Sequence, residues 1–179
     1  MKREQILNLV NILGRMKSLK RTGWIKRQVE NPESDADHSY SLSLLVLLLA
    51  PKNLDLLKCL KLALVHDLPE AFCGDFIPGE LLPEEKATLE KSAMQKIAAD
   101  LKAPELAVLF EEYEQRNTPE AEFVRSLDSL DNVFTARFYE DKSKSLLTDE
   151  FATSALPRIN NLKDEILRDK LLEILKVLN

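Results

Sequence analysis

Residues 53–70 read NLDLLKCLKLALVHDLPE. The leucines of this stretch recur at intervals of three and four residues, which is the spacing of side chains on one face of an α-helix. Asn53 can cap the start of the helix, and Pro69 forces a kink or a new start after it. The stretch therefore predicts a buried helix that carries His66 and Asp67 at its end.

The same helical spacing of apolar residues runs through most of the chain. Glycine is scarce, with 4 residues, and no segment alternates apolar and polar residues as a strand would. Further helices are expected at residues 3–19, 37–50, 83–102, 104–116 and 119–141, with a short helix starting near 148 and a last one over about 160–177. We predict an all-α fold, one helical bundle over residues 1–179 with about eight or nine helices.

The composition excludes several classes of protein. A net charge of -5 argues against binding of nucleic acid polymers, which requires a basic surface. The longest apolar stretch, Leu44 to Ala50, ends at Pro51 and is too short to span a bilayer. The N-terminus does not have the pattern of a signal peptide, and Cys59 and Cys73 fit no disulfide framework. We therefore expect a cytoplasmic protein with no membrane association.

Metal binding is predicted by the two histidines, each of which stands beside an acid, as Asp37-His38 and His66-Asp67. Imidazole and carboxylate together suit Zn, Mn, Fe or Co. Asp128 borders a stripe of apolar residues that is expected to be buried, and a carboxylate in that position needs a partner. A metal shared with the histidines would provide one. The members of the stripe are Phe123, Leu127, Leu130 and Phe134.

Two other groups of residues suit a phosphorylated substrate. Glu70 follows His66 by four residues, and Asp75 lies in a turn after Gly74, where its carboxylate can point into a cleft. Residues 17–27 contain five cations, no acid and the only tryptophan, Trp24. Cations beside an indole suit a ligand with a phosphate and a flat ring.

In its ordered motifs the chain resembles the HD-domain metal-dependent phosphohydrolases, from about residue 3 to residue 141. It has the first histidine, the His-Asp doublet and the distal aspartate in the order of that family. It is most similar to the 5'-deoxynucleotidase-like branch, which has a Trp 14 positions before the first histidine and acids four and nine positions after the histidine of the doublet. The matching residues here are Trp24, Glu33-Ser34, His38, His66, Asp67, Glu70, Asp75 and Asp128.

The resemblance implies a phosphoric monoester hydrolase that acts on nucleoside 5'-monophosphates, the deoxy forms in particular. His38, His66, Asp67 and Asp128 would hold one divalent ion (Mn, Co, Zn, Fe or Mg) in a metal-site core of about residues 20–141, followed by C-terminal helices at about 148–178. The resemblance further implies that Glu70 and Asp75 are catalytic. Arg21 or Arg27 would hold the phosphate, and Trp24 would border the sugar or base. A homodimer is also implied.

Two departures from the family pattern affect the substrate contacts. Some bacterial nucleotidases of this type have Arg directly before the Trp, where this chain has Gly23. Pro69, between the doublet and Glu70, is also unusual. Two alternatives stay open: a phosphodiesterase or nucleoside triphosphate hydrolase, and a metal-stabilised module that binds a nucleotide without turnover. The second is disfavoured because a module that only binds needs neither Glu70 nor Asp75.

Overall fold

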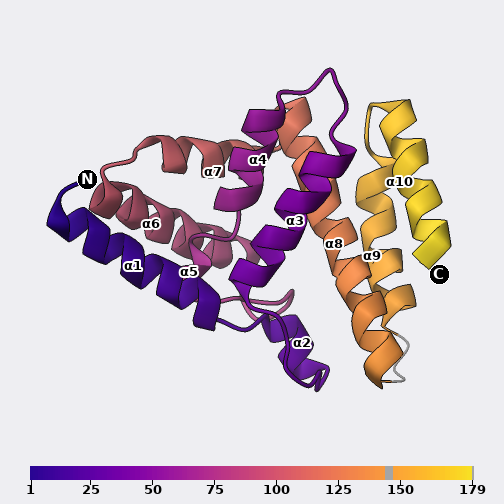
Figure 1. Ribbon diagram of the computed structural model, residues 1–179, viewed down its shortest axis with the longest axis horizontal. Coiled ribbons are helices and arrows are strands. Elements are labelled where there is room, and N and C mark those ends of the chain that lie inside the picture. Colours follow the sequence, from indigo (N-terminus) through magenta and orange to yellow (C-terminus); the bar gives the residue numbers. More distant parts are fainter. Residues whose placement is uncertain (144–146, 179) are drawn as a thin grey trace. The chain divides into compact units, whose positions relative to one another are not determined.

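The computed structural model of the protein describes residues 1–143 and 147–178, with the side chains of all of these except 141–143. Within these residues there are helices and no strand, so the predicted all-α fold is confirmed (Figure 1). The helices are α1 (Arg3–Ser18), α2 (Thr22–Lys26), α3 (Asp35–Leu49), α4 (Leu56–Val65), α5 (Glu70–Cys73), α6 (Pro83–Leu101), α7 (Glu105–Gln115), α8 (Pro119–Ser143), α9 (Thr148–Asn160) and α10 (Glu165–Leu178).

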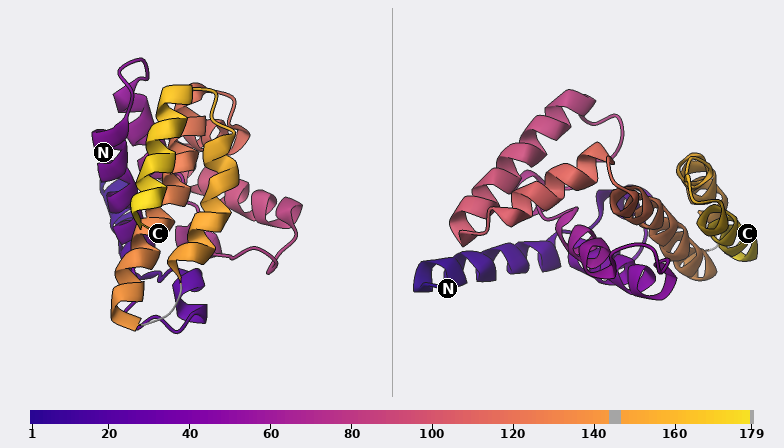
Figure 2. Two further views of the ribbon diagram at one scale, coloured as in Figure 1. Left: turned by 90° about the vertical axis from the view of Figure 1, so that its right-hand side faces the viewer. Right: turned by 90° about the horizontal axis from the view of Figure 1, so that it is seen from above.

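The helices belong to two compact units. Unit 1 comprises Met1–Tyr40 and Leu64–Gln115, and unit 2 comprises Ser41–Ala63 and Arg116–Asn179. In unit 1, α1 packs against α5 and α6, and α6 packs against α7. In unit 2, α8 and α9 lie side by side and α10 packs against both, as Figures 1 and 2 show. The single domain over residues 1–179 stays a prediction.

The core of unit 1 surrounds the end of α4 and the whole of α5. Burial of apolar side chains here excludes water from the segment that carries His66 and Glu70 and stabilises its position. The buried cluster consists of Ile12, Met16, Val65, Ala71, Met94, Ile97 and Phe110.

In unit 2, most of the predicted apolar stripe of α8 is buried. Phe123, Leu127 and Leu130 are at most 1% exposed, whereas Phe134 is 36% exposed and its neighbour Val133 is buried instead. The buried face of α8 therefore includes Val133 in place of the predicted Phe134, which the spacing of apolar residues alone did not indicate. Within the described residues no helix is both long enough and apolar enough to cross a membrane.

Two departures from the predicted helices concern the segment before His38. The helix expected from residue 37 begins at Asp35, and α2 forms inside a segment that was expected to be a loop. The start of α3 is capped by Asp37 from within: its Oδ2 atom accepts hydrogen bonds from the backbone N–H and the hydroxyl of Ser34, at 2.8 and 2.7 Å. These bonds satisfy donors that a helix start leaves without partners, and they fix the first turn of α3.

Candidate metal centre

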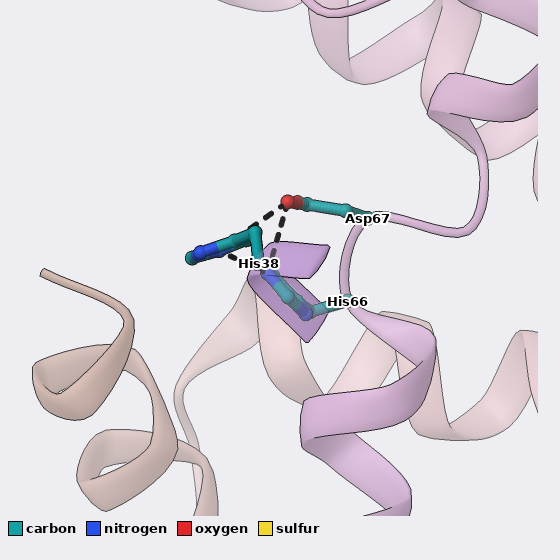
Figure 3. A group of neighbouring side chains, drawn as sticks. All are labelled: His38, His66 and Asp67. Atoms are coloured by element: carbon teal, nitrogen blue, oxygen red, sulfur yellow. Dashed lines mark hydrogen bonds and ion pairs between the residues drawn. The ribbon is translucent and has the colours of Figure 1, made fainter. Parts of the chain in front are cut away.

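Three side chains of unit 1 meet at one point in the buried interior (Figure 3). The Nε2 atoms of His38 and His66 are 3.1 Å apart. The Oδ2 atom of Asp67 lies 3.0 Å from the Nε2 atom of His66 and 3.6 Å from that of His38. His38 is fully buried and His66 is 4% exposed. The structure therefore brings together three of the four residues predicted to bind a metal, and their role as ligands stays a prediction.

The spacing of these three atoms fits a divalent cation. Two nitrogen ligands that each lie about 2.0–2.1 Å from one ion are about 3 Å apart, which is the separation of the two imidazole Nε2 atoms here. Two imidazoles and one carboxylate are also a donor set that Zn, Mn, Fe and Co accept. A single ion can therefore be held by the residues present, with further positions left for other ligands.

Pro69 sets the geometry of the segment between His66 and Glu70. Proline has no backbone N–H, so the carbonyl of Val65 cannot receive its usual helical bond from residue 69. Leu68 donates its N–H to that carbonyl instead, at 3.1 Å. This hydrogen bond spans three residues in place of the four of an α-helix. Helix α4 ends at Val65, and Glu70 begins the new helix α5. The kink predicted at Pro69 is thus present.

Arg21 bonds directly to the candidate ligand set. Its NH1 atom donates to the Oδ2 atom of Asp67 at 2.8 Å. Burial alone would raise the pKa of Asp67, but the charges of His66, Arg21 and His38 outweigh it and hold that pKa well below its usual range. Asp67 is therefore a carboxylate at neutral pH, as a metal ligand must be.

The other two predicted substrate residues make contacts within the protein. Trp24 is 1% exposed, and its indole N–H donates to Glu33 Oε1 at 2.9 Å. The guanidinium of Arg27 donates to the carbonyl of Gly23 at 2.8 Å. A Cβ at Gly23 would lie 3.6 Å from Arg27 NH1, which is ordinary contact, so sterics do not explain why a glycine stands there. The contacts of Trp24 and Arg27 with substrate stay predictions.

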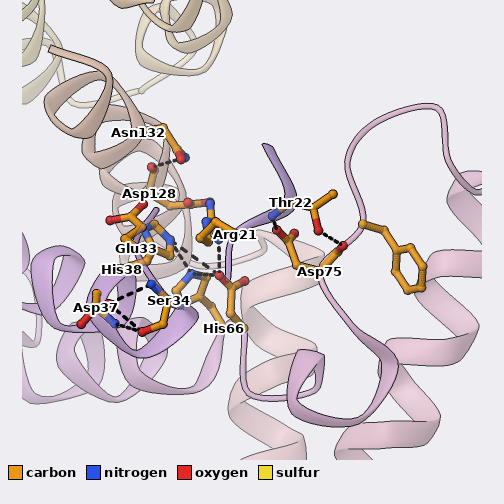
Figure 4. A network of polar contacts seen from close by, with 12 residues as sticks. Arg21, Thr22, Glu33, Ser34, Asp37, His38, His66, Asp75, Asp128 and Asn132 are labelled. Carbon is orange, nitrogen blue, oxygen red and sulfur yellow. Dashed lines mark hydrogen bonds and ion pairs between the residues drawn. The ribbon is translucent and has the colours of Figure 1, made fainter. Parts of the chain in front are cut away.

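Beside the histidines lies a second cluster, formed by the carboxylates of Asp35, Glu70 and Asp75, whose oxygen atoms come within 4.8 Å of one another. Asp35 is fully buried, and neither of its oxygens has a hydrogen-bond partner. The Oε2 atom of Glu70 is likewise buried without a partner. Asp75 is held by Thr22, whose backbone N–H donates to Oδ2 at 2.6 Å (Figure 4). Buried carboxylates in this state are missing a proton or a cation.

Asp35 was not singled out from the sequence. It precedes His38 by three residues in the string Ser34-Asp-Ala-Asp-His, and residues three apart share a face of a helix. That spacing would have identified it, had the start of α3 been placed at Asp35. Lys86 was also missed: its ammonium contacts Glu90 and the Phe76 carbonyl, both at 3.3 Å. Burial would lower the pKa of Lys86, but Glu90, Glu70 and Asp67 raise it.

Asp128, the fourth predicted ligand, lies on α8 in unit 2. The side-chain amide of Asn132 donates a hydrogen bond to the backbone carbonyl of Asp128 at 2.9 Å, so this bond does not involve the Asp128 carboxylate (Figure 4). Its membership of the metal site stays a prediction.

The buried acids give the metal-free protein a pH dependence. Burial first, and then Asp67 and Asp75, raise the pKa of Asp35 from 3.8 to about 7. Between these values the folded chain binds more protons than the unfolded chain, so stability falls as the pH rises. Burial and the acids Asp67, Asp75 and Asp35 also raise the pKa of Glu70. Ionisation of Glu70 therefore also lowers the stability of the folded chain as the pH rises.

We expect Asp35→Asn to make this fall less steep. The measurement is urea unfolding in the presence of a chelator at pH 5 and pH 7.5. Asp37→Asn is the matched control, since hydrogen bonds from Ser34 lower the pKa of Asp37 and its titration lies outside this window. If Asp35→Asn lost as much stability between pH 5 and pH 7.5 as the wild type, the pH dependence would not come from Asp35.

Comparison with known proteins identifies the family. The HD domain family model matches residues 13–166. The chain belongs to the HD-domain family. This confirms the resemblance drawn from the histidines, the doublet and the distal aspartate.

Relatives in this family are named as nucleotidases. The chain is 39% identical to 5'-deoxynucleotidase HDDC2 of Xenopus laevis, over 79% of this chain and 72% of that protein. It is 38% identical to the Homo sapiens protein of the same name, over 76% and 69%, and 38% identical to 5'-deoxynucleotidase hdd1 of Schizosaccharomyces pombe, over 76% and 73%. The predicted similarity to the 5'-deoxynucleotidase branch is therefore confirmed.

Solved structures support the fold of this HD-domain chain. The PH0347 protein from Pyrococcus horikoshii matches with a TM-score of 0.84 and 32% identity, over 97% of this chain and 99% of that chain. A conserved hypothetical protein from Pyrococcus furiosus matches with a TM-score of 0.81 and 33% identity, over 96% and 98%.

Proposed function

We propose that the protein is a metal-dependent phosphohydrolase that releases phosphate from nucleoside 5'-monophosphates, in particular the deoxyribonucleotides. The observation that carries this is the convergence of His38, His66 and Asp67 on one buried point. Relatives at 38–39% identity are named 5'-deoxynucleotidases, which supports the substrate class. A cytoplasmic location is part of the proposal.

His38, His66, Asp67 and, by sequence, Asp128 would hold one divalent cation. When bound, such a cation lowers the pKa of a coordinated water and offsets the charge of the phosphate. The protein's own groups carry the protons. Glu70 Oε2 has no partner in the structure, and a cation at the histidines would favour its ionised form, in which it can accept the proton of the attacking water.

On the leaving-group side, Asp75 would protonate the 5'-oxygen or hold a sugar hydroxyl. Its Oδ2 atom is already oriented by the backbone N–H of Thr22 at 2.6 Å. Arg21, which contacts Asp67 at 2.8 Å, is our candidate among the arginines to bind a phosphate at this centre. Arg27 and Trp24 would contribute through the conformation of α2, on which Trp24 lies.

The carboxylate cluster supports a second role for Glu70 and Asp75, as ligands of another cation together with Asp35. Metal analysis of the purified protein separates the two roles. A content near one ion per chain, unchanged in Asp35→Asn, supports proton transfer by Glu70. A content near two that falls to one in Asp35→Asn supports the ligand role.

The test of the function is a phosphate-release screen over nucleoside mono-, di- and triphosphates and 3',5'-cyclic nucleotides, each with Mn, Co, Zn and Mg. We expect turnover of 5'-monophosphates, faster for the deoxy forms, and none of the cyclic nucleotides. The similarity to 5'-deoxynucleotidases is the reason. Turnover of a cyclic nucleotide without any monophosphate would instead indicate the phosphodiesterase, and the absence of all turnover with tight nucleotide binding would indicate the binding module.

We also propose a homodimer. The resemblance to the family implies it, and α10 adds exposed apolar side chains: Leu171 and Leu175 are buried, but Ile166 and Val177 are 84% and 85% exposed. Unit 2 also exposes apolar side chains of α3, where Leu47 and Leu48 are 55% and 67% exposed. An exposed patch of this kind suits a subunit contact. Light scattering at micromolar concentration should report twice the 20.4 kDa chain mass, and a value of one chain would count against the dimer.

A further inference from the structure

The segment that carries Asp75, residues 74–82, joins the short helix α5 to the long helix α6. The structure describes all of it, and it contains neither helix nor strand. Gly74 and Gly79 have φ values of +88° and +94°, which glycine adopts without strain. Since the segment has no regular backbone ladder, its position depends on contacts from neighbouring side chains.

On one side, α2 holds the segment at Asp75. The backbone N–H of Thr22 donates to Asp75 Oδ2 at 2.6 Å, and the Thr22 hydroxyl donates to the Asp75 carbonyl at 2.8 Å (Figure 4). Further along, Lys26 Nζ lies 2.5 Å from Glu80 Oε1, but these side chains are 47% and 30% exposed, so solvent weakens the pair. Helix α2 has five residues and is too short to be stable without tertiary contacts.

On the other side, Lys86 holds the segment from the first turn of α6. Its Nζ atom donates to the carbonyl of Phe76, the residue directly after Asp75, at 3.3 Å. The same Nζ atom lies 3.3 Å from Oε1 of Glu90, which is one turn further along α6 and is 9% exposed. Lys86 therefore joins the Asp75 segment to a buried acid of a long helix.

The pair with Glu90 keeps Lys86 in place. A buried carboxylate that loses its cation is strongly destabilised, so the ammonium does not leave Glu90 readily. Helix α6 itself packs against α1, α5 and α7, and part of its inward face belongs to the buried cluster around the end of α4. Through Lys86, the position of Asp75 is thus tied to the same helix that packs beside the His66 segment.

Repulsion between acids makes such an anchor necessary. Oxygen atoms of Asp35, Glu70 and Asp75 come within 4.8 Å of one another, and like charges at this distance repel. Asp35 and Glu70 lie on helices, whereas Asp75 lies on the irregular segment and is the one that can move away. Lys86 has the opposite charge: burial would lower its pKa, but nearby acids raise it, Glu90 first and Glu70 after it. Its ammonium is therefore attracted toward this centre.

We infer that Lys86 is a positioning residue for phosphate release, which holds Asp75 beside Glu70 through the Phe76 carbonyl. The inference rests on the proposed function, in which Asp75 serves the leaving group or the sugar. Lys86 acts through Asp75 in this role, and α6 thereby contributes to the geometry of the site.

The kinetic test is a double-mutant cycle. Lys86→Met removes the ammonium and keeps a long side chain, and kcat/KM for a deoxynucleoside 5'-monophosphate should fall about tenfold, as when a hydrogen bond from a charged group is lost. Lys86→Arg keeps the charge and should restore most of the activity. In an Asp75→Asn background, Lys86→Met should have little further effect, because both changes act through one side chain. A fall of the same size in both backgrounds would overturn the inference.

Lys91→Met is the matched control, because Lys91 is an exposed lysine of the same helix that pairs with Glu111 of α7 instead. It should leave kcat/KM unchanged. Lys86→Met with Glu90→Gln is the second variant. It leaves no buried carboxylate without a cation, so it should keep the fold and show the same kinetic fall as Lys86→Met. Wild-type kcat/KM in this double variant would contradict the role of Lys86.

Hydrogen exchange separates this inference from the proposed function, because it requires no turnover. In the metal-free chain, Lys86→Met should speed amide exchange in residues 76–81 several-fold, and Lys91→Met should not. Unchanged exchange in Lys86→Met would overturn the inference even in an active enzyme. If the wild type releases no phosphate from any nucleotide, the proposed function fails, and this measurement alone decides whether Lys86 anchors the segment.

Discussion

Replacement of His66 by Ala is expected to remove the metal and the phosphate-release activity together. The Nε2 atom of His66 lies 3.1 Å from that of His38 and 3.0 Å from the Asp67 carboxylate, so its loss leaves the proposed ligand set with a single imidazole. A metal ion contributes several kcal/mol of transition-state stabilisation. Since each 1.36 kcal/mol is tenfold in rate, activity should fall by at least about a thousandfold.

The measurements are metal content and kcat for His66→Ala, His38→Ala and the wild type. Tyr113→Phe is the control, because the Tyr113 ring packs 5.3 Å from the His66 ring and the substitution retains that packing. It should keep the metal. Unchanged metal content in both histidine variants would remove the basis of the proposed function, whatever the activity shows.

Glu70→Gln is expected to retain metal held by the histidines and to lose turnover. The amide has nearly the shape of the carboxyl group, so it should fit the 4% exposed site, but it cannot take a proton from water. General bases of this kind contribute about a hundred- to ten-thousand-fold in rate. We therefore expect a fall in kcat of that size with little change in KM.

Asp75→Asn provides the comparison for Glu70→Gln. A similar fall in kcat would place Asp75 on the leaving group, and a rise in KM with a smaller change in kcat would place it on the sugar. Metal content is measured in each variant. A Glu70→Gln enzyme with full metal and near-wild-type kcat would show that the attacking water needs no help from this residue.

Much of the metal centre could be predicted because its signals are local in the sequence. The doublet His66-Asp67 ends an apolar run whose periodicity marks a buried helix, and Pro69 marks where that helix must stop. His38 follows an acid at a helix start in the same way. The acid beside it has a different role: Asp37 caps α3 through Ser34, whereas the buried carboxylate is Asp35. Asp35 and Asp37 have the same side chain, so the sequence alone does not show which of them is buried. Their roles follow from the residue at which α3 begins.

The parts that could not be predicted depend on contacts between distant segments. Arg21 reaches Asp67 across 46 positions, and Trp24 turns inward to Glu33. No spacing rule distinguishes an indole that contacts substrate from one that is buried. The partial exposure of Phe134 could not be predicted for the same reason. Helical periodicity shows which side chains share a face of α8, but the segments packed against that face determine how much of it is buried.

The two histidines come from segments 28 positions apart, one at the start of α3 and one after the end of α4. An ion held by both is therefore a reversible cross-link that closes a loop of the chain. Such a closure restricts the opened chain, by an amount that grows slowly with loop length. The metal would then contribute to stability as well as to catalysis: with the ion bound the two ends of this loop cannot separate, and chelation should lower the free energy of unfolding and speed proteolysis between the two histidines.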